Sequence, residues 1–238
     1  MPMQGAAQRT IWQRLTVLPA CPTSSSVDAF GNVVSSGYLG RRHDLFAYEA
    51  AGVVETSGEL RADVPDPMYS YPSPLATPDV ALAQLAMRLG SPALRVEDWV
   101  ERLMSLVSDS IAYTPGVTSV DTTAEQALAL GRGVCQDFAH VAVAICRLAG
   151  LPARYVCGLM EGEGATHAWV EVFTGTHWLP FDPTNKRFVG QQYIKLAHGR
   201  DFADCSISRG VFRGAASQSV SVSVDVWKIS PNEAIPVS

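Results

Sequence analysis

Three residues whose side chains together make a thiol nucleophile occur in order along the chain: Cys135, His167 and Asp182. A thiol that attacks a carbonyl group needs an imidazole to take its proton and a carboxylate to hold that imidazole in the right tautomer. A cysteine with a distant histidine and aspartate is only a candidate nucleophile, because most cysteines beside buried helices act as small apolar residues. The surroundings of each residue therefore decide the interpretation.

Cys135 is predicted to lie at the N-terminus of a buried helix. Apolar residues recur at spacings of three and four from Phe138 to Ala149, and Gly150 indicates the helix end. Gly131 and Gly133 form a flexible approach. The dipole and free N–H groups of a helix N-terminus favour an anion, which suits both a thiolate and an oxyanion.

His167 and Asp182 are predicted to lie at the same end of one hairpin. Alternation from residue 166 to residue 173 places His167 on the same face of a strand as Trp169. Residues 174–177 form a turn, and residues 178–181 are expected to form the returning strand. This register brings the imidazole and the carboxylate within hydrogen-bond reach.

The rest of the chain predicts strands, then helices, then strands. Residues 8–60 read as β, with turn chemistry at Ser24–Ser26 and at Asp28–Asn32. Five prolines mark a linker over residues 61–76. Thr77 is predicted to cap a helix that begins at Pro78.

Further elements are expected on both sides of the cysteine. An apolar stripe from Val96 to Ile111 predicts an amphipathic core helix, and a capping box at Thr122–Glu125 opens a short helix. Strands are expected over residues 153–159 and 192–195. Residues 218–229 alternate apolar and polar and predict a late strand that closes the sheet.

Composition excludes several classes of function. The 238-residue chain has a net charge of −5 and no Lys/Arg cluster, which argues against a nucleic-acid partner. No apolar run is long enough to span a bilayer, and no signal peptide is evident, so we expect a cytoplasmic protein without a membrane partner. The five cysteines are widely spread and fit neither a disulfide framework nor a zinc site. We expect no metal and no cofactor.

Four segments together resemble the bacterial transglutaminase-like superfamily: Gly133–His140, Leu151–Val156, His167–Glu171 and Phe181–Asn185. The resemblance runs from about Phe30 to Trp227. It implies an α+β fold with a papain-like core, in which a nucleophile helix packs on an antiparallel sheet preceded by a small β region. By this resemblance Cys135 is the nucleophile, His167 the general base and acid, and Asp182 the orienting carboxylate.

The expected organisation is an N-terminal β region at 1–60, a linker at 61–76, a transglutaminase-like catalytic domain at 77–230 and a tail at 231–238. Members of this family commonly have several tens more residues before the small β region. We therefore expect either that the start of the sequence is assigned too late or that the N-terminal sheet is truncated. An incomplete sheet would have an exposed edge, which would support oligomerisation.

The expected function is acyl transfer on a peptide or amide bond through a thioester at Cys135. Hydrolysis of a peptide or protein substrate is favoured over transfer to an amine because many bacterial relatives resemble proteases, and no calcium-binding pattern of acidic residues is present. A non-catalytic binding or scaffold module is the other interpretation.

Weaker candidates for the substrate or oxyanion region are Val134, Gln136, Trp169 and Tyr113. Gln136 and Asp137 could instead cap the helix, and Tyr113 could be an ordinary turn residue. Three further residues carry structural expectations. His140 is predicted to be a core residue, His177 a solvated turn residue, and Arg200 a partner of Asp201 in an ion pair.

Overall fold

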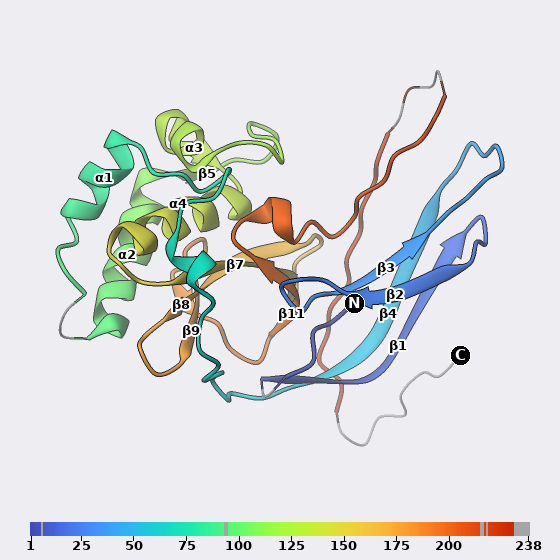
Figure 1. The fold of residues 1–238 in the computed structure, drawn as a ribbon, viewed down its shortest axis with the longest axis horizontal. Helices are drawn as coiled ribbons and strands as arrows, with labels where there is room; N and C mark the ends of the chain where they lie inside the picture. The colour runs from blue at the N-terminus through green and yellow to red at the C-terminus, as the bar shows by residue number, and fades with distance from the viewer. Residues whose placement is uncertain (6, 93–94, 215–216, 218, 231–238) are drawn as a thin grey trace.

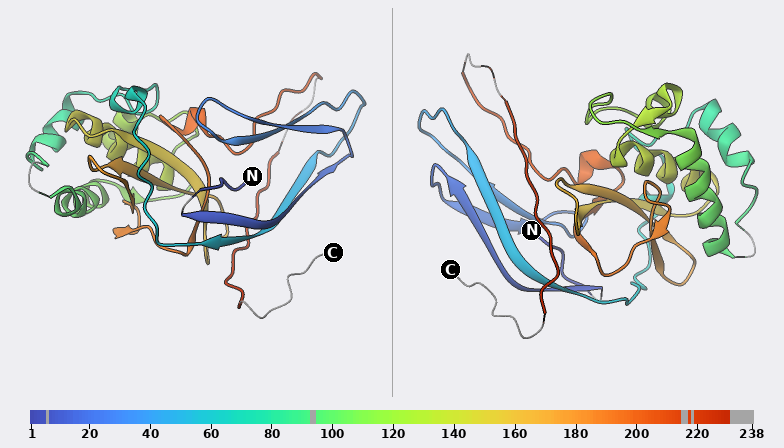
Figure 2. Two further views of the ribbon diagram at one scale, coloured as in Figure 1. Left: turned by 60° about the horizontal axis from the view of Figure 1, so that its bottom comes forward. Right: turned by 180° about the vertical axis from the view of Figure 1, so that it is seen from behind.

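The computed structural model describes residues 1–5, 7–92, 95–214, 217 and 219–230. Helices gather at one end of the molecule, a five-stranded sheet occupies the middle, and the strands β1 to β4 (residues 8–56) extend at the other end (Figure 1). Figure 2 shows the same arrangement from two further directions, with these strands projecting away from the helices. The expected α+β class is confirmed.

The central sheet has five antiparallel strands in the order β10-β9-β8-β7-β11. Their bounds are β7 Ala153–Met160, β8 His167–Phe173, β9 Trp178–Asp182, β10 Arg187–Phe188 and β11 Tyr193–Gly199. The predicted strand at 153–159 is confirmed, and the one at 192–195 is longer than expected. Because β11 pairs with β7 and not with β10, the chain between β10 and β11 must cross the sheet.

Four helices cover one face of this sheet. They are α1 Val80–Met87, α2 Val96–Ser110, α3 Ala124–Leu130 and α4 Cys135–Leu148. Ala168, Val170 and Val172 of β8 point into the same core cluster as α4, whose residues from Phe138 to Arg147 are all buried. The strict alternation of β8 therefore fixes which of its side chains face the helices and which face the opposite side.

Two helix starts differ from the prediction. α1 begins at Val80, because the Asp79 carboxylate accepts the N–H of Leu82 at 2.8 Å, whereas the Thr77 hydroxyl donates to the Ser73 carbonyl. The Thr77–Pro78 start was therefore wrong. The capping box before α3 lies one residue later than expected, since Thr123 is the cap and Gln126 returns the bond.

The N-terminal β region contains two antiparallel strand pairs, and the second pair lies between the strands of the first along the chain. β1 Gln8–Leu18 pairs with β4 Ala47–Thr56, and β2 Thr23–Val27 pairs with β3 Val33–Gly37. Ser24–Ser26 lie inside β2, so the predicted turn there was wrong. The Asp28–Asn32 turn is confirmed, because the Asp28 carboxylate accepts the N–H groups of Phe30 and Asn32 at 2.9 and 2.8 Å.

Two side-chain amides of the N-terminal β region bind the free edge of β11. The Gln8 amide donates to the Lys195 carbonyl at 2.7 Å and accepts the Lys195 N–H at 2.8 Å. The Asn32 amide does the same with His198, at 2.8 and 2.9 Å. Each amide thus satisfies one donor and one acceptor, as a neighbouring strand would.

The predicted late strand is not formed in the described residues 219–230, which have no ladder partner. One backbone bond, from the Val224 N–H to the Gly164 carbonyl at 3.2 Å, ties this segment to the loop before β8. The start of the predicted strand at residue 218 and the predicted tail at 231–238 lie outside the described residues. The range 61–76 includes a short 3-10 helix at Pro67–Ser70.

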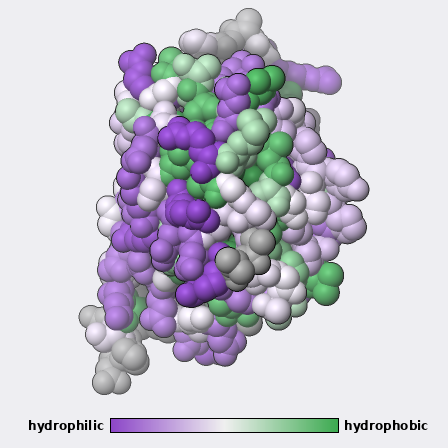
Figure 3. All heavy atoms as spheres, turned by 90° about the vertical axis from the view of Figure 1, so that its left-hand side faces the viewer, coloured by the Kyte–Doolittle hydropathy of each residue, from purple (hydrophilic) through white to green (hydrophobic). Residues whose placement is uncertain are grey.

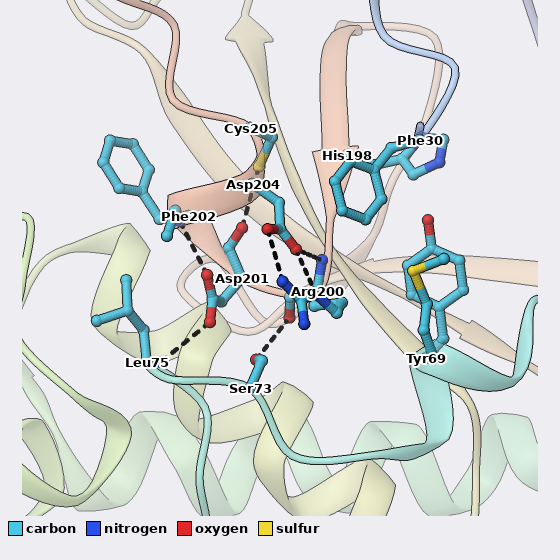
Figure 4. A network of polar contacts seen from close by, with 12 residues as sticks. Phe30, Tyr69, Ser73, Leu75, His198, Arg200, Asp201, Phe202, Asp204 and Cys205 are labelled. Atoms are coloured by element: carbon cyan, nitrogen blue, oxygen red, sulfur yellow. Dashed lines mark hydrogen bonds and ion pairs between the residues drawn. The ribbon is translucent and has the colours of Figure 1, made fainter. Parts of the chain in front are cut away.

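Arg200 pairs with Asp204, with its Nε 2.8 Å from the carboxylate, so the expected pair with Asp201 was wrong (Figure 4). Asp201 instead accepts the N–H of Leu75 at 3.0 Å and the N–H of Ala203 at 2.9 Å. It caps the 3-10 helix Phe202–Asp204 and holds the segment before α1 against the end of β11. The conformation of residues 200–204, and not proximity in the sequence, determines which carboxylate pairs with the Arg200 guanidinium.

No helix among the described residues is both long and apolar enough to cross a membrane. On the face formed by α1 and α2, hydrophilic and apolar side chains are interspersed (Figure 3).

Candidate active site

Cys135 is the first residue of α4, which confirms its predicted place at a helix N-terminus. Its side chain is half-buried. The preceding residues Arg132–Gly133 form the short strand β6, which pairs in parallel with β5 Ala112–Tyr113. Before it, Gly131 has a φ of 63° and ends α3, a conformation that favours glycine. The short strand β6 and the turn at Gly131 place Cys135 at the end of α4 that lies closest to Tyr113.

Asp137 fixes the start of α4. Its carboxylate accepts the Val134 N–H at 2.8 Å and the Thr118 hydroxyl at 2.7 Å. Gly133 permits this approach, because a Cβ at that position would lie 2.7 Å from the Cβ of Asp137. Burial raises the pKa of Asp137, against the effect of these hydrogen bonds.

The opposite end of α4 is anchored by the buried Arg147. Its guanidinium donates to the carbonyls of Tyr69 at 3.1 Å, Ala153 at 2.9 Å and Arg200 at 2.7 Å, and to the Ser73 hydroxyl at 3.0 Å. Both ends of the helix are therefore fixed by hydrogen bonds. The backbone at Cys135 is held by the fold and not by the cysteine itself.

The helix start leaves backbone donors near the sulfur. Because the Val134 N–H is bonded to Asp137, it is not free to bind a ligand. In the part of the chain that the structure describes, the N–H groups of Cys135 and Gln136 have no acceptor, as expected at the first turn of a helix. These donors are the ones that could meet a developing oxyanion.

His167 and Asp182 form a buried pair, with the imidazole Nε2 2.7 Å from a carboxylate oxygen. Val170 lies opposite Phe181 in the β8–β9 pairing, which is the register that the hairpin predicts. His167 is 4 % exposed and Asp182 is fully buried. Since Nε2 is bonded to Asp182, the other ring nitrogen, Nδ1, is left for Cys135.

The Cys135 thiol lies near enough to the His167 ring to affect the pKa of the imidazole. Burial alone would lower the pKa of His167, but hydrogen bonds from its ring to Asp182 and Cys135, and their negative charges, raise it to about 10. Burial would raise the pKa of Asp182, but its hydrogen bond to His167 and the imidazolium charge, followed by Asn185 and Tyr193, lower it. The arrangement favours a protonated imidazole beside the ionised Asp182 carboxylate.

Five donors surround the Asp182 carboxylate. One oxygen accepts the backbone N–H groups of Thr184 and Asn185, at 2.9 and 3.2 Å. The other accepts His167, the Asn185 amide at 2.7 Å and the Tyr193 hydroxyl at 2.8 Å. A buried carboxylate with this many donors stays ionised without a direct Lys or Arg partner.

The weaker candidates from the sequence lie around the site in different ways. The Tyr113 ring is 55 % exposed and sits near Cys135, whose charge contributes after burial to raising the pKa of Tyr113. The Gln136 amide donates to the Val120 carbonyl at 3.0 Å, so it holds a loop. Trp169 is buried and stacks behind His167, with ring centroids 6.4 Å apart.

Most of the remaining histidines and of the other cysteines lie in the protein interior or in turns. His140 is fully buried and accepts the Phe202 N–H, which confirms the core assignment. His177 is half-buried in the predicted turn. Cys146, Cys157 and Cys205 are buried, and burial raises the pKa of each thiol. Among the described residues, no three His, Cys, Asp or Glu side chains group as a metal site.

Sequence reasoning missed the role of Asn185 and Tyr193 beside Asp182, and of Thr118 beside Asp137. Asn185 is in the quoted motif and three residues after the aspartate, so an Asx-type contact could have been found from spacing. Tyr193 and Thr118 carry no local signal, because only the tertiary fold brings them to these carboxylates.

One family model matches the part of the chain that holds the candidate site. The family model described as the transglutaminase-like superfamily matches residues 83–183, a range that contains all three candidate residues. The chain belongs to the transglutaminase-like superfamily.

Relatives of this transglutaminase-like chain occur in mycobacteria. An uncharacterized protein of Mycobacterium leprae is 28% identical over 253 residues, covering 96% of this chain and 90% of the relative. An uncharacterized protein of Mycobacterium tuberculosis is 31% identical over 270 residues, covering 94% of this chain and 84% of the relative.

A solved structure shares the fold over almost the whole chain. This candidate cysteine protease from Cytophaga hutchinsonii superposes with a TM-score of 0.75 at 24% identity, over 95% of this chain and 83% of that one. The predicted papain-like core preceded by a β region is thereby confirmed.

Proposed function

We propose that the protein is a cysteine-dependent hydrolase that cleaves a peptide or amide bond through a thioester at Cys135. The observation that carries the proposal is the buried His167–Asp182 pair at 2.7 Å, with Cys135 at the helix N-terminus within reach of the imidazole. Groups whose pKa is shifted by burial together with a specific charged partner are concentrated at functional sites.

The reaction follows from the positions of these groups. The Cys135 sulfur attacks the carbonyl carbon, a C–S bond forms, and the carbonyl oxygen takes the negative charge beside the free N–H groups at the start of α4. Each such donor typically contributes about 3–4 kcal/mol to stabilising the transition state. The C–N bond then breaks as the His167 imidazolium gives its proton to the leaving amine.

Release of the thioester regenerates the starting state. His167, now neutral, accepts a proton from a water molecule whose oxygen attacks the thioester carbon. The C–S bond breaks, the acid product leaves, and the thiolate–imidazolium pair is restored. The half-buried Cys135 and the 55 % exposed Tyr113 beside it support water as the acceptor, because solvent can reach this side of the site.

A test without a known substrate uses the chain's own cysteines. Native protein is alkylated with limiting iodoacetamide from pH 5.5 to 9, and the label is located by mass spectrometry in wild type and in His167→Ala. Cys21 is a matched internal control, since it is also free and half-buried but lies in the N-terminal β region. An ordinary thiol reacts mainly near and above pH ~8.5.

The expected result is that Cys135 takes most of the label near pH 6, and that His167→Ala removes this preference. A Cys135 that reacts no faster than Cys21 over the whole range contradicts the proposal and leaves a binding module as the better account. If labelling is selective, single-turnover assays with a peptide library and a fluorescent primary amine distinguish hydrolysis from amine transfer. Incorporation of the amine would contradict the hydrolytic assignment only.

A further inference from the structure

Tyr193 lies between a surface cation and the carboxylate of the candidate site. Its hydroxyl donates to Asp182 at 2.8 Å and accepts from the Arg187 Nε at 2.9 Å. A guanidinium is always a donor, so the hydroxyl proton cannot point toward Arg187 and is directed at Asp182. Arg187 is exposed, while Tyr193 is 3 % exposed. The three side chains form a path from the surface to the buried pair.

The crossover between β10 and β11 delivers this tyrosine. Tyr193 is the first residue of β11, so it lies where the chain has just crossed the sheet from the β9–β10 side. Its ring packs against Trp169 and His167, with centroids 5.3 and 6.0 Å apart. Gly158 of β7 has no side chain to separate these groups, since a Cβ there would collide with the Trp169 ring.

The charges around Asp182 make a neutral donor useful. His167 faces Asp182 from β8, and Asn185 faces it from the following turn, while Lys186 is turned away to pair with Asp109. Were Arg187 itself bonded to Asp182, its full charge would compete with the imidazolium for the carboxylate. The hydroxyl holds the carboxylate while keeping that charge one side chain away. Burial and the Asp182 charge raise the pKa of Tyr193, so it remains a donor.

We infer that Tyr193, oriented by Arg187, is a positioning residue for Asp182, and through it for His167 and Cys135. This inference rests on the proposed function, since a positioned carboxylate matters for rate only where Cys135 acts as a nucleophile. Tyr193 does not touch the reacting atoms. Its loss should leave the fold in place and disturb the ionisation and orientation of the carboxylate.

The test compares the pH dependence of Cys135 alkylation in four variants with wild type. Tyr193→Phe removes one hydroxyl and keeps the ring, and Tyr69→Phe is its control, because Tyr69 is equally buried but packs on Trp178 and His198 away from the site. Arg187→Gln removes the orienting cation, with Lys186→Gln as its exposed neighbour control. Circular dichroism establishes that each variant is folded.

We expect Tyr193→Phe to react roughly tenfold more slowly at pH 6, with the acidic limb moved to higher pH, as for loss of one hydrogen bond to a charged group. Arg187→Gln should shift the limb in the same direction by less, and the two controls should match wild type. Superimposable profiles for Tyr193→Phe and Tyr69→Phe would overturn the inference.

Failure of the inference is separable from failure of the proposed function. Selective labelling of Cys135 in wild type, and its loss in His167→Ala, decide the function without any tyrosine variant. If that selectivity is absent, carbon-13 NMR of the Asp182 carboxyl still decides the positioning role, since its titration midpoint should be about one pH unit higher in Tyr193→Phe than in Tyr69→Phe. Equal midpoints count against Tyr193.

Discussion

At the scale of single residues, the candidate site is organised around a buried carboxylate that is held by four neutral donors and one imidazole. Asp182 accepts two backbone N–H groups, an amide, a hydroxyl and an imidazole. The imidazole is therefore the group that carries positive charge next to it. This explains why its pKa rises although His167 is almost completely buried.

The raised pKa makes part of the folding free energy depend on pH. In the folded chain the pKa of His167 is about 10, above the ordinary value of 6.5, so the folded state binds the proton more tightly. The stabilisation is fully present below pH 6.5 and is lost as pH rises toward 10. We predict that His167→Gln destabilises the protein more at pH 6 than at pH 9.5, by roughly 1–3 kcal/mol.

Urea unfolding of wild type and variant at both pH values measures this difference. His177→Gln is the control, since His177 is a turn residue whose ring lies beside the Thr174 and Thr176 hydroxyls. Equal destabilisation of His167→Gln at the two pH values would show that the imidazole is neutral in the folded protein.

The sequence predicted the three central residues because each signal is local. A helix pattern follows Cys135, and one hairpin relates His167 to Asp182. Tyr193 and Arg187 escaped prediction because the crossover joins strands that are neighbours in sequence but not in the sheet. No spacing rule connects residue 193 to residue 182 before the strand order is known.

At the scale of elements, the position of Cys135 depends on how α4 starts. The Asp137 carboxylate occupies the space where a side chain at residue 133 would be, and it bonds the Val134 N–H. We predict that Gly133→Ala pushes this carboxylate away, destabilises the fold by about 1–3 kcal/mol and removes selective alkylation of Cys135.

Thermal unfolding and iodoacetamide labelling together check this prediction. Gly58→Ala is the matched control, because a Cβ at Gly58 meets nothing within 4 Å. A Gly133→Ala variant with the stability and labelling of wild type would mean that the helix start tolerates a shifted Asp137.

The errors at this scale have physical causes. Thr77 and Asp79 are both good capping types, and only the structure shows that Thr77 uses its hydroxyl to bond Ser73. The alternation over residues 218–229 satisfies a strand pattern, but a strand also needs a free edge. The β11 edge is already bound by Gln8 and Asn32, which the sequence could not reveal.

At the scale of the whole molecule, two amides join the N-terminal β region to the central sheet. Gln8 and Asn32 are 7 % and 3 % exposed and bond both backbone groups of Lys195 and His198. An unpaired sheet edge otherwise invites association with other chains. Docking of the N-terminal region therefore protects this edge in addition to covering the sheet.

We predict that Asn32→Ala lowers the free energy of unfolding by about 1–3 kcal/mol, because two buried backbone groups lose their partner. Urea denaturation measures the loss, and limited proteolysis should show faster cleavage between β1 and β4. Gln13→Ala in β1 is the control, since Gln13 is exposed. A variant as stable and as resistant as the control would mean that water replaces the amide at no cost.

The same two amides divide β11 into two sets of backbone protons with different routes to solvent. The N–H groups of Lys195 and His198 are covered by side chains of another region, whereas those directed at β7 are covered by a strand ladder. In deuterated water, the first set should exchange whenever the N-terminal region detaches, and the second only when the sheet itself opens. The exchange rates of the two sets of N–H groups in one strand would thus report two events separately, detachment of the N-terminal region and global unfolding.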